Sequence, residues 1–535
     1  MTAPAIELKA INKRFGPVWA NRDIDLKVMP GTVHGIVGEN GAGKSTLMSI
    51  LYGFYTADTG EILVNGQNLD IRNSQQAIQA GIGMVHQHFM LVEPFTVLEN
   101  VMLGMEGQAV LANARGKARK ALQDIASRYG LEVDPDAIVG ELPVGLQQRV
   151  EILKALYRGA KILILDEPTS VLTPQETGQL FEILESLRSQ GVTVLLITHK
   201  LKEIMAITNH VSIMRAGTMV AHRETAHTSP EELAELMVGR KVLLRVDKQP
   251  AQPGEQRMEI KNLDYSDDRG VRRLKDINFN LRSGEILGVA GVSGNGQSEL
   301  LKMLSGALAP NQGVMVLDTR AGHSELSAGS WRDAAEIRDL GIAHVPENRL
   351  RQALVKAFSA AENAILGYHD KPEYGETFLE PEKVVNATEV MMEAYDVRPR
   401  LPGLKTANFS GGNQQKLVLA REMLKEPDIL LIGQPTRGVD IGAIEFIHRN
   451  MIAARDKGAA VLLVSVELDE ILSLSDRIIV MNDGAITGEV MASETNEAEL
   501  GLLMTSTAGE VPTAGNGPTG GAKAPQSEQQ EEAVA

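Results

Sequence analysis

Residues that could bind a nucleotide lie together near the start of the chain. The spacing Gly38-x4-Gly43-Lys44-Ser45 is that of a phosphate-binding loop. In such a loop the backbone N–H groups and a helix N-terminus surround a triphosphate, Lys44 reaches the β- and γ-phosphates, and Ser45 binds Mg²⁺. We therefore predict that the whole loop binds the triphosphate of a nucleotide, through Gly38, Glu39, Asn40, Gly41, Ala42, Gly43, Lys44, Ser45 and Thr46.

Acidic residues that could complete this chemistry follow an apolar run farther along the chain. Residues 161–165 lead into Asp166 and Glu167, and residues 192–198 lead into His199. The carboxyl end of a buried strand is where α/β proteins place their chemistry. There Asp166 could hold Mg²⁺ through water and Glu167 could orient or deprotonate the attacking water. The acids could instead cap a following helix, and a histidine at a strand end is more often structural.

The elements that must position these residues alternate between strand and helix. Residues 34–37 form an apolar run before the phosphate loop, and residues 47–51 after it have a helical pattern. Similar alternation continues through the chain, which is typical of a mostly parallel sheet with packed helices. The predicted class is α/β.

The chain also repeats itself. Residues 81–87 match residues 341–347, and residues 96–104 match residues 359–367. We predict a duplication with a first domain at 6–240, a linker at 241–257 and a second domain at 258–504. Residues 505–535 contain almost no large apolar side chains, so we expect a disordered tail there.

Composition restricts the functional class. The chain has 535 residues, 53 Lys and Arg against 69 Asp and Glu, and a net charge of −16, which argues against a nucleic-acid binder. It contains no cysteine, so disulfides, zinc-thiolate sites and thiol catalysis are excluded and a cytosolic location fits best. No apolar run reaches about 18 residues and no secretory signal is visible, so we expect a soluble chain without a transmembrane helix.

The order of these motifs resembles the nucleotide-binding domain of an ABC ATPase. Between the phosphate loop and Asp166 lie Gln87 and residues 142–149, and the second copy carries Ser410-Gly411-Gly412-Asn413-Gln414-Gln415-Lys416, similar to the ABC signature. Two fused copies with this signature resemble the ATPase subunits of importers for ribose, galactose and related sugars. The purine-nucleoside branch is the most similar, and there Gly433-Gln434 stands in place of the usual Asp-Glu.

The resemblance implies a head-to-tail pseudo-dimer in which each ATP lies between the phosphate loop of one copy and the signature of the other. For the first such site it implies that Phe15 stacks on adenine, that Gln87 contributes to catalysis and binds Mg²⁺, and that His199 contacts the γ-phosphate. The signature residues completing that site would be Ser410, Gly411 and Gly412.

The second composite site departs from the pattern at most of its parts. Its phosphate loop, residues 291–299, has Gln297 where the first loop has Lys44, which removes a charge-assisted contact of roughly 1.5 to 3 kcal/mol. In the signature serving this site, Pro143 has neither a hydroxyl nor an N–H. The other departures are Glu347 for Gln87, Gly433 for Asp166, Gln434 for Glu167, Val466 for His199, and Asp267 opposite Phe15, with Tyr265 nearby. Asp440, which would face the first site, is retained, while its counterpart is Thr173. We predict one hydrolytic site, with the other at most a nucleotide-binding strut.

The resemblance also implies partners. Transport would require two separate membrane permease subunits and a solute-binding protein acting through them, so this chain would be peripheral on the cytoplasmic face of the membrane and touch it only through the permeases. Residues 88–95 are unusually apolar for a loop and are a candidate docking surface, although Phe89, Leu91 and Phe95 could simply pack beneath a helical insertion. The predicted function is ATP-driven import of purine nucleosides, with monosaccharide import as the alternative and a soluble twin-ABC translation factor as a remote one.

Overall fold

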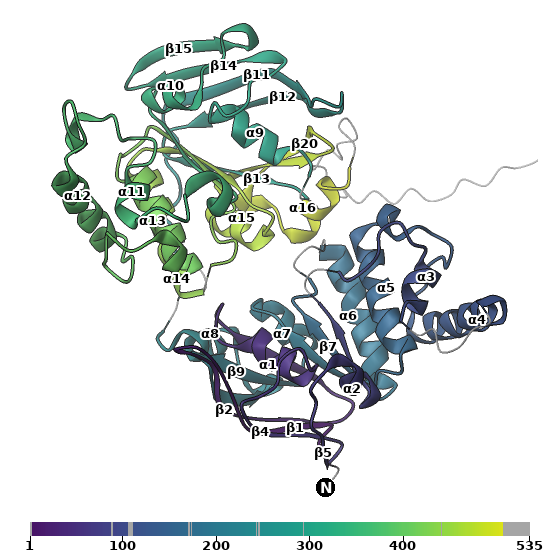
Figure 1. The fold of residues 1–535 in the computed structure, drawn as a ribbon. Coiled ribbons are helices and arrows are strands. Elements are labelled where there is room, and N and C mark those ends of the chain that lie inside the picture. Colours follow the sequence, from purple (N-terminus) through teal and green to yellow (C-terminus); the bar gives the residue numbers. More distant parts are fainter. Residues whose placement is uncertain are drawn as a thin grey trace, which may run out of the picture.

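The computed structural model describes residues 3–86, 89–104, 111–169, 172, 174–241, 243, 247–292, 294–439 and 441–506. Within this part of the chain, no helix is both long and apolar enough to cross a bilayer. The duplication is evident in Figure 1, where two α/β units follow one another, each with its own sheets and helices. The predicted fold class is confirmed.

In the first copy, a six-stranded sheet has the order β10-β9-β3-β8-β7-β6, in which only the β9–β10 pair is antiparallel. A four-stranded antiparallel sheet has the order β2-β1-β4-β5. The strands are β1 (Ile6–Phe15), β2 (Val18–Val28), β3 (Val33–Gly38), β4 (Thr59–Val64), β5 (Gln67–Asn68), β6 (Ile82–Val85), β7 (Ile162–Asp166), β8 (Thr193–Ile197), β9 (His210–Arg215) and β10 (Thr218–Glu224). The helices are α1 (Lys44–Leu51), α2 (Ser74–Gln79), α3 (Val97–Met102), α4 (Leu111–Tyr129), α5 (Val144–Tyr157), α6 (Pro174–Ser189), α7 (Leu201–Ile207) and α8 (Pro230–Val238).

The second copy repeats both sheets. Its six-stranded sheet has the order β20-β19-β13-β18-β17-β16, and its antiparallel sheet has the order β12-β11-β14-β15. The strands are β11 (Gln256–Ser266), β12 (Arg272–Arg282), β13 (Glu285–Ala290), β14 (Gln312–Thr319), β15 (Gly322–Ser327), β16 (Ile342–Val345), β17 (Ile429–Gly433), β18 (Ala460–Val464), β19 (Arg477–Asn482) and β20 (Ala485–Met491). The helices are α9 (Gln297–Leu304), α10 (Ala334–Asp339), α11 (Ala360–Ala364), α12 (Pro381–Ala394), α13 (Gly411–Met423), α14 (Ile441–Asp456), α15 (Leu468–Leu474) and α16 (Glu497–Leu503).

Burial explains why the parallel strands form where they do. Every residue of β3 and of β13 is buried, as expected for central strands covered on both faces. The helical insertions begin with matching caps, because Thr96 and Ser359 each form a capping box with a glutamate three residues later. The two antiparallel sheets were not predicted. Their longest strands, β1, β2, β11 and β12, are bulged where they pair and only partly buried, so they lack the continuous apolar runs that mark the central strands.

The two copies are oriented in opposite directions. In Figure 1 the antiparallel sheets lie at the far ends of the molecule, and the insertions α3–α5 and α11–α13 project to opposite sides. Between the copies, Ile441 at the start of α14 packs against a first-copy core that includes Leu233 and Met237 of α8. The connecting segment is anchored to the second copy, where Lys248 donates to the carbonyl of Leu474, 2.9 Å away. The residues 507–535 of the predicted tail lie outside the described residues.

Candidate functional site

The first phosphate loop joins the end of β3 to the start of α1. Gly43, the N-cap of α1, has a φ of 98° in the left-handed region. A Cβ at Gly43 would stand 2.1 Å from the carbonyl oxygen of Ala20, and one at Gly38 would stand 2.4 Å from that of Met214. Both positions therefore require glycine, because the loop passes directly over neighbouring backbone.

Lys44 is the first residue of α1 and its side chain bends back over the loop. Its ammonium donates to the carbonyl of Gly38 at 2.6 Å and to that of Glu39 at 3.0 Å, and only 6% of the residue is exposed. The positive charge therefore lies at the mouth of the loop, beside a helix N-terminus that also favours anions.

The strand end of β7 brings a carboxylate to the same loop. The hydroxyl of Ser45 hydrogen-bonds the carboxylate of Asp166. Burial, followed by the neighbouring charge of Glu167, raises the pKa of Asp166 above its ordinary value. Two of the three residues predicted to bind Mg²⁺, Ser45 and Asp166, are thus brought together, and the third, Gln87, lies outside the described residues.

Glu167 and His199 also meet, at the ends of adjacent strands β7 and β8. The Nδ1 atom of His199 lies 3.0 Å from Oε1 of Glu167, and this hydrogen bond is the main cause that lowers the pKa of Glu167. Glu167 has a φ of 47°, a strained conformation for a residue with a side chain. Sequence reasoning gave His199 a phosphate contact and missed this contact with the carboxylate, because a direct His–Glu bond depends on the register of the two strands.

Phe15 is the residue predicted to contact the adenine at the first site. Phe15 ends β1 and is 43% exposed, with its ring edge-on to Tyr55 at 5.3 Å between ring centres. Gln87, Thr173 and Asp440 lie outside the described residues.

The predicted signature lies at the start of α13 in the second copy. Ser410 is the N-cap of that helix, and its hydroxyl accepts a hydrogen bond from the side-chain amide of Asn413 at 2.9 Å. A Cβ at Gly411 would stand 2.8 Å from the carbonyl oxygen of Gly438, which precedes α14. The α14 helix in turn reaches the first loop, since a Cβ at Gly442 would lie 3.5 Å from the Glu39 carboxylate. In the first copy, the equivalent N-cap is Pro143, which makes no side-chain cap.

The second phosphate loop keeps the backbone shape of the first and changes its side chains. Gly296 has a φ of 99°, close to that of Gly43, and the Gln297 amide donates to the carbonyl of Val292 at 3.2 Å. The hydroxyl of Ser298 donates to the carboxylate of Glu347 at 2.5 Å. A Cβ at Gly433 would stand 2.6 Å from Cγ of Glu347, so Glu347 fills the space that an aspartate at 433 would need.

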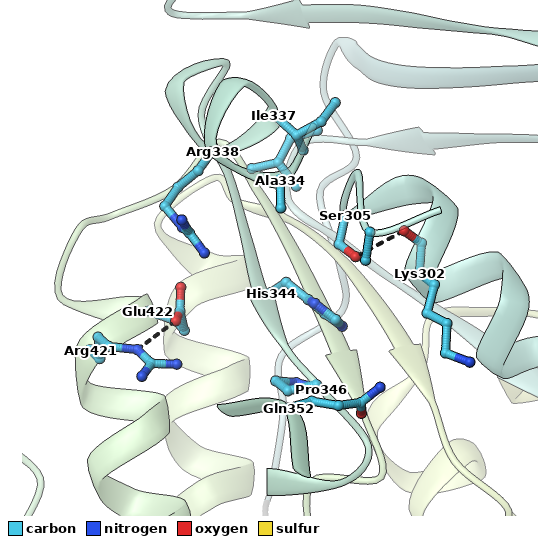
Figure 2. Close-up of a pocket in the computed structure, with 12 residues that line it drawn as sticks. Lys302, Ser305, Ala334, Ile337, Arg338, His344, Pro346, Gln352, Arg421 and Glu422 are labelled. Atoms are coloured by element: carbon cyan, nitrogen blue, oxygen red, sulfur yellow. Dashed lines mark hydrogen bonds and ion pairs between the residues drawn. The ribbon is translucent and has the colours of Figure 1, made fainter. Parts of the chain in front are cut away.

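A cavity of about 300 Å³ lies where β16 ends, lined in part by residues of α9, α10 and α13. Figure 2 shows His344 between Lys302 on one side and the Arg421–Glu422 pair on the other, with Arg338 above. Burial lowers the pKa of His344 to about 4, and its Nε2 has no hydrogen-bond partner among the described residues. The equivalent region of the first copy holds the packed rings of Tyr52, Phe54 and His86.

The raised pKa of Asp166 leads to a stability prediction. When the pKa of a carboxyl group is higher in the folded than in the unfolded protein, the folded protein loses stability as the pH rises from the unfolded pKa through the folded pKa. At neutral pH, above both values, the cost of ionising the buried group is present in full. Asp166→Asn keeps an oxygen for the Ser45 bond and removes the charge. We expect the nucleotide-free chain to gain about 1 kcal/mol, or roughly 2 to 4 °C in Tm by calorimetry without Mg²⁺. A lower Tm would show that the Asp166 charge stabilises the fold.

Comparison with known proteins agrees with this arrangement. The family described as "ABC transporter" matches residues 21–170 and 274–437. The nucleoside import ATP-binding protein NupA of Lactococcus lactis is 45% identical over 502 residues, covering 93% of this chain and 97% of its own. The guanosine import ATP-binding protein NupO of Bacillus subtilis is 43% identical, with the same coverage, and the glucose import ATP-binding protein TsgD13 of Haloferax volcanii is 41% identical, covering 96% and 98%.

These relatives span nearly the whole chain, and the family matches once in each copy. The resemblance inferred from the motifs is therefore confirmed. The chain belongs to the ABC transporter family, as a two-cassette, ATP-binding ATPase subunit of an importer.

Proposed function

We propose that this ATPase subunit energises the import of purine nucleosides through separate membrane permease subunits, assisted by a solute-binding protein. The observation that supports this substrate is the similarity, over 93% of the chain, to one relative named for nucleoside import and another named for guanosine import. Such a subunit would be peripheral on the cytoplasmic face of the membrane and would touch the membrane only through the permeases. It would bind no nucleic acid.

Monosaccharide import is the second candidate, and the similarity to a glucose import protein favours it. The two are separated by measuring ATP hydrolysis of the chain assembled with its permeases and binding protein, adding purine nucleosides, ribose, galactose and glucose in turn. We expect stimulation by a nucleoside alone. Stimulation by a sugar alone would establish the second candidate, and no stimulation by either would contradict both.

Hydrolysis is proposed to take place at the first composite site. Lys44 and the loop N–H groups hold the β- and γ-phosphates, and Phe15 contacts the adenine. Glu167 accepts the proton of the attacking water, and its lowered pKa keeps it ionised and able to do so. His199 orients that carboxylate through their 3.0 Å contact. Gln87 is proposed to link the site to the permease side, and Ser410, Gly411 and Gly412 contact the γ-phosphate from the second copy.

The first site offers the oxygen donors that Mg²⁺ prefers, the Ser45 hydroxyl and the Asp166 carboxylate, already joined by a hydrogen bond. Among the described residues no cluster of three acidic or histidine side chains could hold a metal alone. This suits Mg²⁺, which usually takes one or two protein ligands together with substrate phosphates. The ion would neutralise charge developing on the phosphates.

The second composite site is proposed to bind a nucleotide without hydrolysing it. Glu347 supplies a carboxylate to Ser298 as Asp166 does to Ser45, whereas Gln434 offers no base. We expect equilibrium dialysis with a non-hydrolysable ATP analogue and Mg²⁺ to find two nucleotides bound per chain. Glu347→Ala should leave the tighter nucleotide bound and weaken the other at least about tenfold, since the Mg²⁺ that accompanies the second nucleotide would lose a carboxylate ligand. One bound nucleotide in the unaltered chain would refute binding at the second site.

Permease docking is proposed for the region around residues 89–95. Leu91 packs against the core of the helical insertion, which for this residue favours the alternative of packing beneath the insertion. Met90 is 59% exposed, and Phe54 nearby in the fold is 51% exposed next to His86. Exposed apolar side chains of this kind are the ones that a partner would cover.

A further inference from the structure

The helices α7 and α15 occupy the same place in the two copies and differ in charge. The first copy reads Lys200-Leu201-Lys202-Glu203 at the start of α7, and the second reads Glu467-Leu468-Asp469-Glu470 at the start of α15. The glutamates that end these two segments are buried in both copies. The difference is therefore confined to the outward-facing positions, which are basic in one copy and acidic in the other.

These positions face each other across the boundary between the copies. The Nζ atom of Lys200 lies 3.5 Å from the carboxylate of Glu467. Lys202 forms an ion pair with Asp469 and a second, at 2.7 Å, with Glu497 at the start of α16. Glu467 and Asp469 are the residues of the second copy equivalent to Lys200 and Lys202. Because equivalent residues contact each other, the local two-fold axis relating the copies passes between α7 and α15.

Contacts on a two-fold axis bring equivalent positions together, so an interface between identical surfaces must be self-complementary. The surface of the first cassette around Lys200 and Lys202 is not self-complementary, and neither is the surface of the second cassette around Glu467 and Asp469. Two first cassettes joined in the same way would oppose Lys200 to Lys200 and Lys202 to Lys202. Two second cassettes would oppose Glu467 to Glu467 and Asp469 to Asp469. Only the mixed pair places opposite charges together.

The strength of these contacts decides what they can do. The side chains are between 29% and 59% exposed, so each ion pair stabilises the structure by only about 0.2 to 1 kcal/mol. Like charges at the same positions would be unfavourable by a similar amount. The contacts therefore contribute little to stability, and their main effect is the difference between the mixed and the like pairing.

We propose that Lys200, Lys202, Glu467 and Asp469 form a charge code that directs the first cassette to pair with a second cassette and rejects pairing with another first cassette. The proposal concerns partner choice and does not depend on which solute is imported. It identifies the surface around the two-fold axis as the one that recognises a second cassette of this same chain. A like pair of first cassettes would place each intact phosphate loop opposite Pro143, which lacks the donor groups of Ser410.

The natural chain has no cysteine, so pairing can be read by disulfide formation between introduced cysteines. A suitable reporter is Val238→Cys with Gly442→Cys, because a Val238 methyl lies 3.0 Å from the position of a Cβ at Gly442. The full chain carrying this reporter is compared in three backgrounds: natural charges, Lys200→Glu with Lys202→Glu, and those two together with Glu467→Lys and Asp469→Lys.

With natural charges, the reporter should give a rapid cross-link within one chain. The two-residue reversal makes both surfaces acidic, and the cross-linking rate should fall about three- to tenfold at low salt. The four-residue exchange should restore most of the rate, because only the contact of position 202 with Glu497 stays unfavourable, and added salt should remove the difference between backgrounds. Circular dichroism and Tm confirm that each variant is folded.

A chain with Val238→Cys and Gln175→Cys, in which Gln175 is the residue equivalent to Gly442, reports like pairing with all the charges kept, since two first cassettes would join as a disulfide-linked dimer. We expect no such dimer with natural charges. An unchanged cross-linking rate in the two-residue reversal, a failure of the exchange to restore it, or dimers of the chain with Val238→Cys and Gln175→Cys would each overturn the proposal.

Discussion

Glu167→Gln is expected to abolish ATP hydrolysis by the assembled importer while leaving ATP binding intact. A general base contributes about 100- to 10,000-fold to a reaction rate, and Glu167 has the lowered pKa and the histidine partner that suit this role. The loss should be at least about 100-fold in kcat, with little change in ATP affinity. Phosphate release by the reconstituted complex and binding of a fluorescent ATP analogue measure the two effects.

The structure indicates that this variant folds. Gln434 stands at the equivalent position of the second copy with a φ of 48°, and its N–H donates to Val464 at 2.8 Å, as that of Glu167 does to Ile197. Gln434→Glu is the matched control and should not raise hydrolysis. Substantial residual turnover in Glu167→Gln would mean that another group activates the water.

The second large effect is expected for Lys44→Gln, which gives the first loop the side chain of the second. The substitution removes a charge-assisted contact with the phosphates that is worth roughly 1.5 to 3 kcal/mol. ATP affinity at the first site should fall about 10- to 150-fold. The fold should persist, because Gln297 shows that a glutamine at this position donates to its own loop at 3.2 Å. Binding measured by titration calorimetry in the presence of Mg²⁺ tests this.

Gln297→Lys is the reciprocal variant. It should strengthen nucleotide binding at the second loop without creating a second hydrolytic site, because Gly433 and Gln434 still provide neither carboxylate. A clear rise in turnover per chain in this variant would contradict the proposed division between the two sites. Unchanged ATP binding in Lys44→Gln would show that the lysine does not contact the nucleotide.

Much of the first site could be predicted from sequence because its parts are local. The glycines of the loop Gly38–Thr46 allow its backbone conformation locally, without distant residues. The strand β7 ends at Asp166 because an apolar run stops there. The hydrogen bond between Ser45 and Asp166 follows once both segments are placed at the same sheet edge.

Features that depend on long-range packing could not be predicted. The antiparallel sheet begins with β1, whose pairing with β4 is set by residues about fifty positions apart and by bulges that break the alternation of buried side chains. The contact between Ser298 and Glu347 likewise needed the structure, since sequence alignment shows only that a glutamate replaces Gln87. It does not show that Glu347 occupies the space beside Gly433. The charge pairing between α7 and α15 depends on how the two copies meet.

The central claim is that one composite site, built on the first phosphate loop, hydrolyses ATP. The most direct test is vanadate trapping of the working importer with radioactive 8-azido-ATP, followed by photolabelling, proteolysis and a count of trapped ADP. The account predicts one trapped ADP per chain, with the label in peptides from the first copy, residues 6–240. Two trapped ADP per chain, or label in peptides from residues 258–504, would contradict it.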